Sequence, residues 1–133
     1  MSENKTIVPS VTIDCRQYCI NVGRDVVRLL GCPECICILE SERQHTIAFA
    51  PCDDSVVLSF KVPERFPEDR NRKFRIYSQS LVMEIMAKYN LDSGHSYTLK
   101  GKLDDVMKAV VFHLDEIYDC TRKNKRKYTM YLF

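Results

Sequence analysis

The chain has 133 residues, 45% of them hydrophobic and 29% charged, which is typical of a single globular domain. Its apolar runs are far shorter than the roughly 20 residues of a membrane span, and its N-terminus lacks a secretory-signal pattern, so we expect a cytoplasmic protein without membrane contact. The net charge is +2, but outside five basic residues near the C-terminus the chain has 15 Lys and Arg against 18 Asp and Glu, or −3. Such a body disfavours duplex DNA binding unless its basic residues cluster locally.

The first half, residues 11–54, predicts two strands, a short helix and two further strands. Apolar and polar residues alternate at 11–14, and a turn leads to a second strand at 18–22. Gly23 ends that strand, Asp25 suits the start of a helix, and Gly31 suits its C-terminal cap. The elements that follow are a strand at 34–39, a charged turn at 40–44, and an antiparallel strand at 46–50 that Pro51 ends.

The second half, residues 55–118, predicts the same order with different side chains. Its elements are strands at 56–62 and 74–77 around an exposed loop at 63–73, a helix at 81–89 with Ser78 as N-cap, and strands at 97–103 and 109–114. Four short strands and one helix make only half a core, so the halves must pack together. We therefore expect one α+β domain over residues 1–133: two ββαββ repeats that form one pseudo-symmetric barrel with two short helices.

This order in the first half resembles the swapped-hairpin family of the AbrB, MazE and SpoVT type. The resemblance covers about forty residues: 11–16, Ile20-Asn21, 25–31 and the hairpin at 36–51. It implies a swapped-hairpin barrel in which the second repeat replaces the second chain of the family's dimer. Two features of the family are missing, because Gly23-Arg24 stands in place of its proline at the helix start and its turn glycine is absent. The chain also resembles small accessory proteins of clostridial mobile elements and phages.

The resemblance implies a DNA-binding transcriptional regulator. Arg16 at the hairpin turn, Arg24 at the helix start and Arg28 on the helix would face the nucleic acid, since guanidinium groups suit phosphates and guanine edges. The plainer alternative is that these three arginines only keep a small domain soluble. The other functional hypothesis is a protein-binding inhibitor, such as an antitoxin or a phage anti-defence protein, whose acidic body occupies a partner's basic site. A homodimer is compatible with both.

The seven cysteines include one C-x-x-C step within Cys32, Cys35 and Cys37. A structural zinc site usually needs two such steps, and Cys35 and Cys37 share one face of a predicted strand. We expect free thiols packed in the fold in a reducing compartment; a zinc site and a redox pair remain the alternatives. No cofactor is implied.

No catalytic set is evident, so we expect a binding protein and not an enzyme. His45, His95 and His113 are isolated in the sequence, and none has a Ser or Cys neighbour that would suit nucleophilic attack. The carboxylate pairs Asp53-Asp54 and Asp104-Asp105 fit turns better than a Mg²⁺ or acid–base site.

The tail, residues 119–133, is basic and then aromatic. Its five cations are Arg122, Lys123, Lys125, Arg126 and Lys127, and residues 128–133 follow as Tyr-Thr-Met-Tyr-Leu-Phe. This pattern favours single-stranded nucleic acid or an anionic partner. A strand on an open sheet edge and a disordered basic end are the alternatives.

Overall fold

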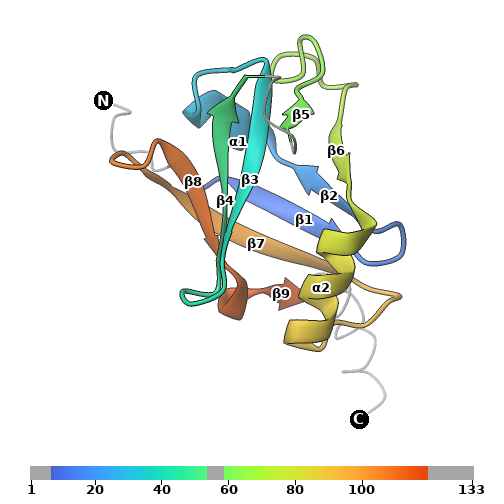
Figure 1. Ribbon diagram of the computed structural model, residues 1–133. Coiled ribbons are helices and arrows are strands. Elements are labelled where there is room, and N and C mark those ends of the chain that lie inside the picture. The colour runs from blue at the N-terminus through green and yellow to red at the C-terminus, as the bar shows by residue number, and fades with distance from the viewer. Residues whose placement is uncertain (1–6, 54–58, 120–133) are drawn as a thin grey trace.

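The structure is a computed structural model that describes residues 7–53 and 59–119. Within these residues, a mostly antiparallel sheet curls into a nearly closed barrel with two α-helices (Figure 1). The α+β, barrel-like class predicted from the sequence is therefore confirmed.

The elements follow the order that the periodicity predicts. They are β1 (Ser10–Asp14), β2 (Cys19–Val22), α1 (Arg24–Leu29), β3 (Cys35–Ser41), β4 (Thr46–Cys52), β5 (Ser59–Lys61), β6 (Phe74–Tyr77), α2 (Gln79–Tyr89), β7 (Ser96–Asp104), β8 (Ala109–His113), a 3-10 helix (Leu114–Glu116) and β9 (Tyr118–Asp119).

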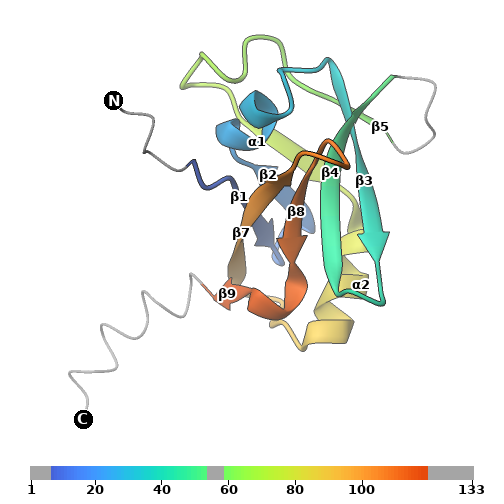
Figure 2. The ribbon, with the colours of Figure 1, turned by 90° about the vertical axis from the view of Figure 1, so that its left-hand side faces the viewer.

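The strands are ordered β5-β3-β4-β8-β7-β1-β2-β6, and every pairing is antiparallel. Among the described residues no pairing joins β5 to β6, the two ends of this order, so this part of the barrel is open. Strand β9 continues the course of β8 and pairs with the first part of β7, where Asp119 lies opposite Tyr97 (Figure 2).

Apolar side chains at alternate positions of the strands point inward, and branched and aromatic residues fill the barrel. Val11 and Ile13 of β1 are buried, as are Ile47 and Phe49 of β4. The ring of Phe49 meets that of Phe112 edge to face, with 5.5 Å between centroids, a favoured aromatic geometry. Each strand therefore turns every second side chain inward, as the period-2 patterns predict.

The two helices lie toward opposite ends of the molecule (Figures 1 and 2). Helix α1 buries Val26 and Val27, and α2 buries Val82 and Ile85. Gly31 follows α1 with φ +82°, the left-handed conformation of a helix C-terminal cap, as predicted. Neither α-helix in the described part of the chain is long and apolar enough to cross a membrane.

Some boundaries differ from those predicted. Strand β3 continues through Glu40 to Ser41, because the ladder with β4 reaches Thr46, so the charged turn is shorter than expected. Strand β4 passes through Pro51 to Cys52. Strand β8 pairs with β4 only as far as Phe49, so Pro51 lies on an edge, where a missing N–H is tolerated. The 3-10 helix and β9 were not predicted, and residues 54–58 lie outside the described residues.

Candidate nucleic-acid interface

The loop at residues 62–73 lies against α1, and Arg24 holds it there. Arg24 Nη2 donates to the backbone carbonyls of Asp69 at 3.0 Å and Arg72 at 3.1 Å. Its guanidinium carbon is 5.3 Å from the ring centroid of Phe66, which is itself buried. These are charge-assisted and cation–π interactions. The Arg24 guanidinium is therefore an anchor for the loop as well as part of a basic surface.

Arg28 makes a second connection to the same loop. Its Nη2 donates to the carbonyl of Pro67, and its Nη1 lies 3.3 Å from Asp25 Oδ1. About half of the Arg28 side chain remains exposed. Arg24 and Arg28, which the resemblance assigned to nucleic acid, thus lie beside one loop, with the charge of Arg28 partly balanced by Asp25.

A hollow of about 310 Å³ lies where this loop joins β6. Its lining residues are Asn21, Val22, Arg24, Phe66, Arg72, Lys73, Phe74 and Arg75, which include four cations and no carboxylate. Asp69 of the same loop pairs with Arg72 at 3.5 Å. Together these groups carry a net charge of +3, so the hollow suits a phosphate or another anion.

Neighbouring side chains of the sheet position Arg75 in this hollow. Asn21 of β2 lies opposite Arg75 of β6 in the ladder, and Arg75 Nε donates to Asn21 Oδ1 at 3.1 Å. A hydrogen bond with Tyr77 raises the pKa of Arg75 above its usual value. Arg75 is therefore an exposed cation whose guanidinium group is held by neighbours on β2 and β6.

Arg16 lies away from these residues. It occupies the β1–β2 turn, at the opposite end of that hairpin from α1. Its side chain is 64% exposed, and its Nε lies 3.7 Å from Asp14 Oδ1. Asp14 also accepts hydrogen bonds from the backbone N–H groups of Arg16 and Gln17. The structure thus brings Arg24 and Arg28 together and leaves Arg16 separate from them.

Three residues of the hollow were missed in the sequence: Arg72, Lys73 and Arg75. The signal was present in the run Arg70-Asn-Arg-Lys-Phe-Arg75. Acidic residues earlier in the same loop, Glu64, Glu68 and Asp69, balance these cations in the sequence. The sequence pattern therefore predicts an exposed loop of mixed charge. The predicted tail cations, Arg122, Lys123, Lys125, Arg126 and Lys127, lie outside the described residues.

An acidic surface lies elsewhere, beside α2. Lys88 Nζ is 3.3 Å from Glu84, 3.4 Å from Glu42 and 3.7 Å from Glu40. One ammonium group faces three carboxylates, so this surface keeps a negative charge. It is the acidic region that an inhibitor of a basic partner would need.

Among the described cysteines, Cys32 is exposed, and the other five divide into two groups. Cys15 and Cys19 are buried in the barrel, and burial raises the pKa of the Cys15 thiol to about 11. Cys35 and Cys37 share one face of β3, as predicted, and Cys52 lies opposite Cys35 in the β3–β4 ladder. Burial, followed by the neighbouring Cys37, raises the pKa of Cys52 to about 11. Among the described residues no three His, Cys, Asp or Glu side chains are placed to hold a metal ion.

The histidines are separate from one another and have local partners. His45 Nδ1 lies 3.0 Å from the Tyr89 hydroxyl, and His95 Nδ1 lies 2.9 Å from Asp119 Oδ2. His113 is exposed at the end of β8. Asp104 accepts hydrogen bonds from two backbone N–H groups of the β7–β8 turn, which is the turn role predicted for it.

Comparison of the chain with models of protein families, with curated proteins and with solved structures found no match. The function proposed for this protein therefore rests on the geometry of the basic hollow and of the surfaces around it.

Proposed function

We propose that this protein binds nucleic acid, as a DNA-binding regulator of the AbrB-like kind, through the surface around the basic hollow. The observation that carries this proposal is the hollow's lining: Arg24, Arg72, Lys73 and Arg75 with no carboxylate among the lining residues. Arginine and lysine contacts to phosphates supply most of the affinity of such proteins and fix their register on the duplex. The acidic balance of the whole body is compatible with this, because the cations are gathered on one surface.

We further propose that the two halves are structurally equivalent repeats. If β1, β2, β3 and β4 correspond to β5, β6, β7 and β8, then the β1–β7 pairing corresponds to the β3–β5 pairing. Exchanging each strand for its equivalent leaves two pairings unchanged: β2–β6 becomes β6–β2, and β4–β8 becomes β8–β4. These relationships support a swapped-hairpin barrel made from one chain. The β1–β2 pairing has no counterpart between β5 and β6 among the described residues.

If the repeats are equivalent, the hollow would lie where they meet. Asn21 and Arg24 come from the first repeat, and Arg72, Lys73 and Arg75 come from the second. The β2–β6 pairing would lie on the axis that relates the repeats. A surface that both repeats build is consistent with the second repeat standing in for the partner chain of a family dimer.

A charge-reversal variant tests the proposal. Arg72→Glu, Lys73→Glu and Arg75→Glu are combined, and Arg24 is left intact because it anchors the loop. The matched control combines Arg43→Glu, Lys61→Glu and Lys100→Glu, which change the net charge equally at exposed positions outside the hollow. Binding to a fluorescent 30-base-pair duplex is measured by anisotropy between 50 and 200 mM salt.

We expect the hollow variant to bind at least ~10-fold more weakly than the control, and its log–log salt slope to fall by about one for each lost phosphate contact. Equal losses in the two variants, or no binding by the unmodified protein at 50 mM salt, contradict the proposal. A separate Arg16→Glu variant shows whether the β1–β2 turn belongs to the same interface.

The second candidate function is a protein-binding inhibitor, which the acidic surface around Lys88 favours. In this case Glu42→Lys combined with Glu84→Lys abolishes capture of a basic partner protein, whereas the hollow variant retains it. The opposite result supports the nucleic-acid proposal.

A further inference from the structure

The outer face of the sheet formed by β3, β4 and β8 is unusually apolar. Antiparallel sheets normally turn one apolar face to the core and one polar face to water. Here Ile47, Phe49 and Val110 point into the barrel core, yet the alternate positions Ala48 and Ala109 are also nearly inaccessible. They belong to a second apolar cluster, on the outside, that consists of Ala48, Ala50 and Ala109 with Cys37 and Val111 packed beside them.

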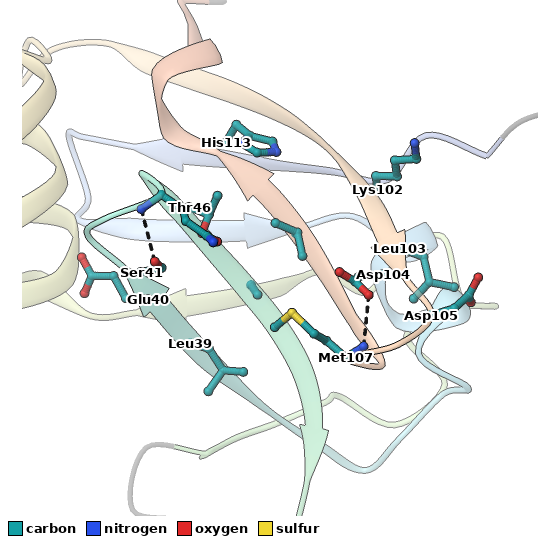
Figure 3. A pocket seen from close by; sticks show the side chains of 13 residues that line it. Leu39, Glu40, Ser41, Thr46, Lys102, Leu103, Asp104, Asp105, Met107 and His113 are labelled. Carbon is teal, nitrogen blue, oxygen red and sulfur yellow. Dashed lines mark hydrogen bonds between the residues drawn. The ribbon is translucent and has the colours of Figure 1, made fainter.

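A groove of about 630 Å³ runs over this face (Figure 3). Ala48 and Val111 contribute to its floor, and Leu39 and Met107 line it from β3 and from the β7–β8 turn. Leu39 is 45% exposed and Met107 is 54% exposed. Asp104 Oδ1 accepts the Met107 N–H at 3.1 Å, so the turn that carries Met107 is held in place. The groove therefore has apolar residues on its floor and polar or charged residues such as Ser41, Thr46 and His113 around them, and none of the described residues covers it.

The groove also has a negative rim. Its lining residues include Glu40, Asp104 and Asp105, against the single cation Lys102. The net charge of these four residues is −2, or −1 when Lys88, which lies 3.7 Å from Glu40, is included. An occupant with apolar side chains followed or preceded by cations would complement both the floor and the rim.

We propose that the groove is the docking site for residues 122–133 of the same chain, the basic and aromatic part of the tail. Residues 122–127 supply five cations for the acidic rim, and residues 128–133 supply aromatic, Met and Leu side chains for the apolar floor. Methionine and aromatic side chains adapt well to a shallow apolar surface. The cations of the tail therefore complement the acidic rim of the groove, and its apolar side chains complement the apolar floor.

The reach of the chain allows this arrangement within one molecule. Asp119 lies opposite Tyr97 on β7, and the groove begins at Lys102 on that same strand. The separation along β7 is about 17 Å at ~3.3 Å per residue. Residues 120–127 can extend to about 26 Å, which is enough to bring residue 128 to the near end of the groove at Lys102, from where residues 128–133 can extend over its floor.

The docked tail is independent of the proposed nucleic-acid function, because the groove and the basic hollow share no lining residue. Docking has one consequence for charge. The cations of residues 122–127 are then balanced by the groove rim, and are not free to act as an unattached basic extension.

Limited trypsin digestion of the full-length protein tests the proposal, with the tail peptides followed by mass spectrometry. The groove variant combines Leu39→Lys and Met107→Lys, which place cations where the apolar residues would dock. The control combines Val8→Lys and Met83→Lys, at positions with similar exposure that do not line the groove. Cleavage within residues 122–127 should be about tenfold slower in the unmodified protein and control than in the groove variant, since proteolysis follows the population of the undocked tail.

Equal tail cleavage in the unmodified protein and the groove variant overturns the proposal. Protection that disappears on hundredfold dilution also overturns it, because the tail would then occupy a second copy. A second measurement, on ¹³C-methyl-methionine protein, does not depend on the variant folding. We expect a nuclear Overhauser contact between the methyl groups of Met130 and Met107, and its absence counts against docking in this groove.

Discussion

The guanidinium of Arg24 lies 5.3 Å from the ring centroid of Phe66, and the same group bonds to two carbonyls of the loop that carries Phe66. One side chain at the start of α1 thereby fixes a loop more than forty residues away in the sequence. Arg72, whose carbonyl accepts one of these hydrogen bonds, and Lys73 belong to this loop and line the hollow beside Arg75. Arg24 therefore organises the basic hollow besides contributing charge to it.

Arg24→Lys should lower the free energy of unfolding by about 1.5–3 kcal/mol, a typical contribution of hydrogen bonds to a charged group. Lysine keeps the charge but cannot reproduce the planar fork that bonds two carbonyls and stacks on Phe66. Arg28→Lys, at a half-exposed position, is the control and should cost less. Urea denaturation followed by circular dichroism measures both. No loss of stability in Arg24→Lys would show that Arg24 does not anchor the loop.

Gly101→Ala should destabilise the protein by about 1–3 kcal/mol, as overpacking of a filled core does. A Cβ at this position would lie 2.6 Å from Cε2 of Phe112 and 2.7 Å from the carbonyl oxygen of Val111. The backbone oxygen cannot move away without disturbing the β7–β8 ladder. Gly94→Ala is the control, because its Cβ would meet nothing within 4 Å. Thermal unfolding of both variants measures the difference, and a Gly101→Ala variant as stable as Gly94→Ala refutes the prediction.

The buried Cys15 thiol should make stability fall at alkaline pH. Burial raises its pKa from 9.0 to about 11, so above pH 9 the unfolded chain releases the proton while the folded chain retains it. The contribution of the neutral thiol is complete below pH 9 and is lost as the pH rises through 11. A difference of two pKa units corresponds to about 3 kcal/mol at most.

Cys15→Ala isolates this effect, since it removes the titrating group. Urea unfolding midpoints of the unmodified protein and of Cys15→Ala are compared at pH 8 and pH 10.5. The alanine variant should be less stable than the unmodified protein at both pH values, because it loses packing. The difference in stability between the two proteins should, however, be smaller at pH 10.5 than at pH 8. A difference that does not change with pH would falsify the assignment.

His95→Ala should loosen β9. His95 Nδ1 lies 2.9 Å from Asp119 Oδ2 and connects the segment before β7 to the end of β9, whereas its link to Asp92 is longer, at 3.9 Å. We expect amide hydrogen exchange of β9 to accelerate about tenfold, in line with the loss of one hydrogen bond of ~1.4 kcal/mol. Asp92→Asn is the control and should have little effect. Unchanged exchange in His95→Ala contradicts the prediction.

Much of the fold was predictable because the local patterns are clear. Ser10–Asp14 and Phe74–Tyr77 alternate at period 2, and the apolar residues of Gln79–Tyr89 recur at helical spacing. Gly31 takes the cap position that its freedom at positive φ predicts. Such features are encoded within a few residues, so the sequence is enough to locate them.

The candidate site was only partly predictable, because its geometry depends on contacts across the chain. Arg24 and Arg28 were identified, but nothing local indicates that their guanidinium groups bind carbonyls of residues 62–73. The cations Arg72 and Lys73 sit in a loop of mixed charge, and only the folded loop separates them from most of its acids.

The sequence by itself determined the alternation of strands and helices, the α+β class and the composition of both termini, since these follow from periodicity, turn residues and charge. Only the tertiary structure decided which cations share a surface and which sheet face is apolar on the outside. Pairings such as Asn21 with Arg75 and Ala48 with Val111 join residues more than fifty positions apart. Register between distant strands sets those contacts, and no local pattern specifies it.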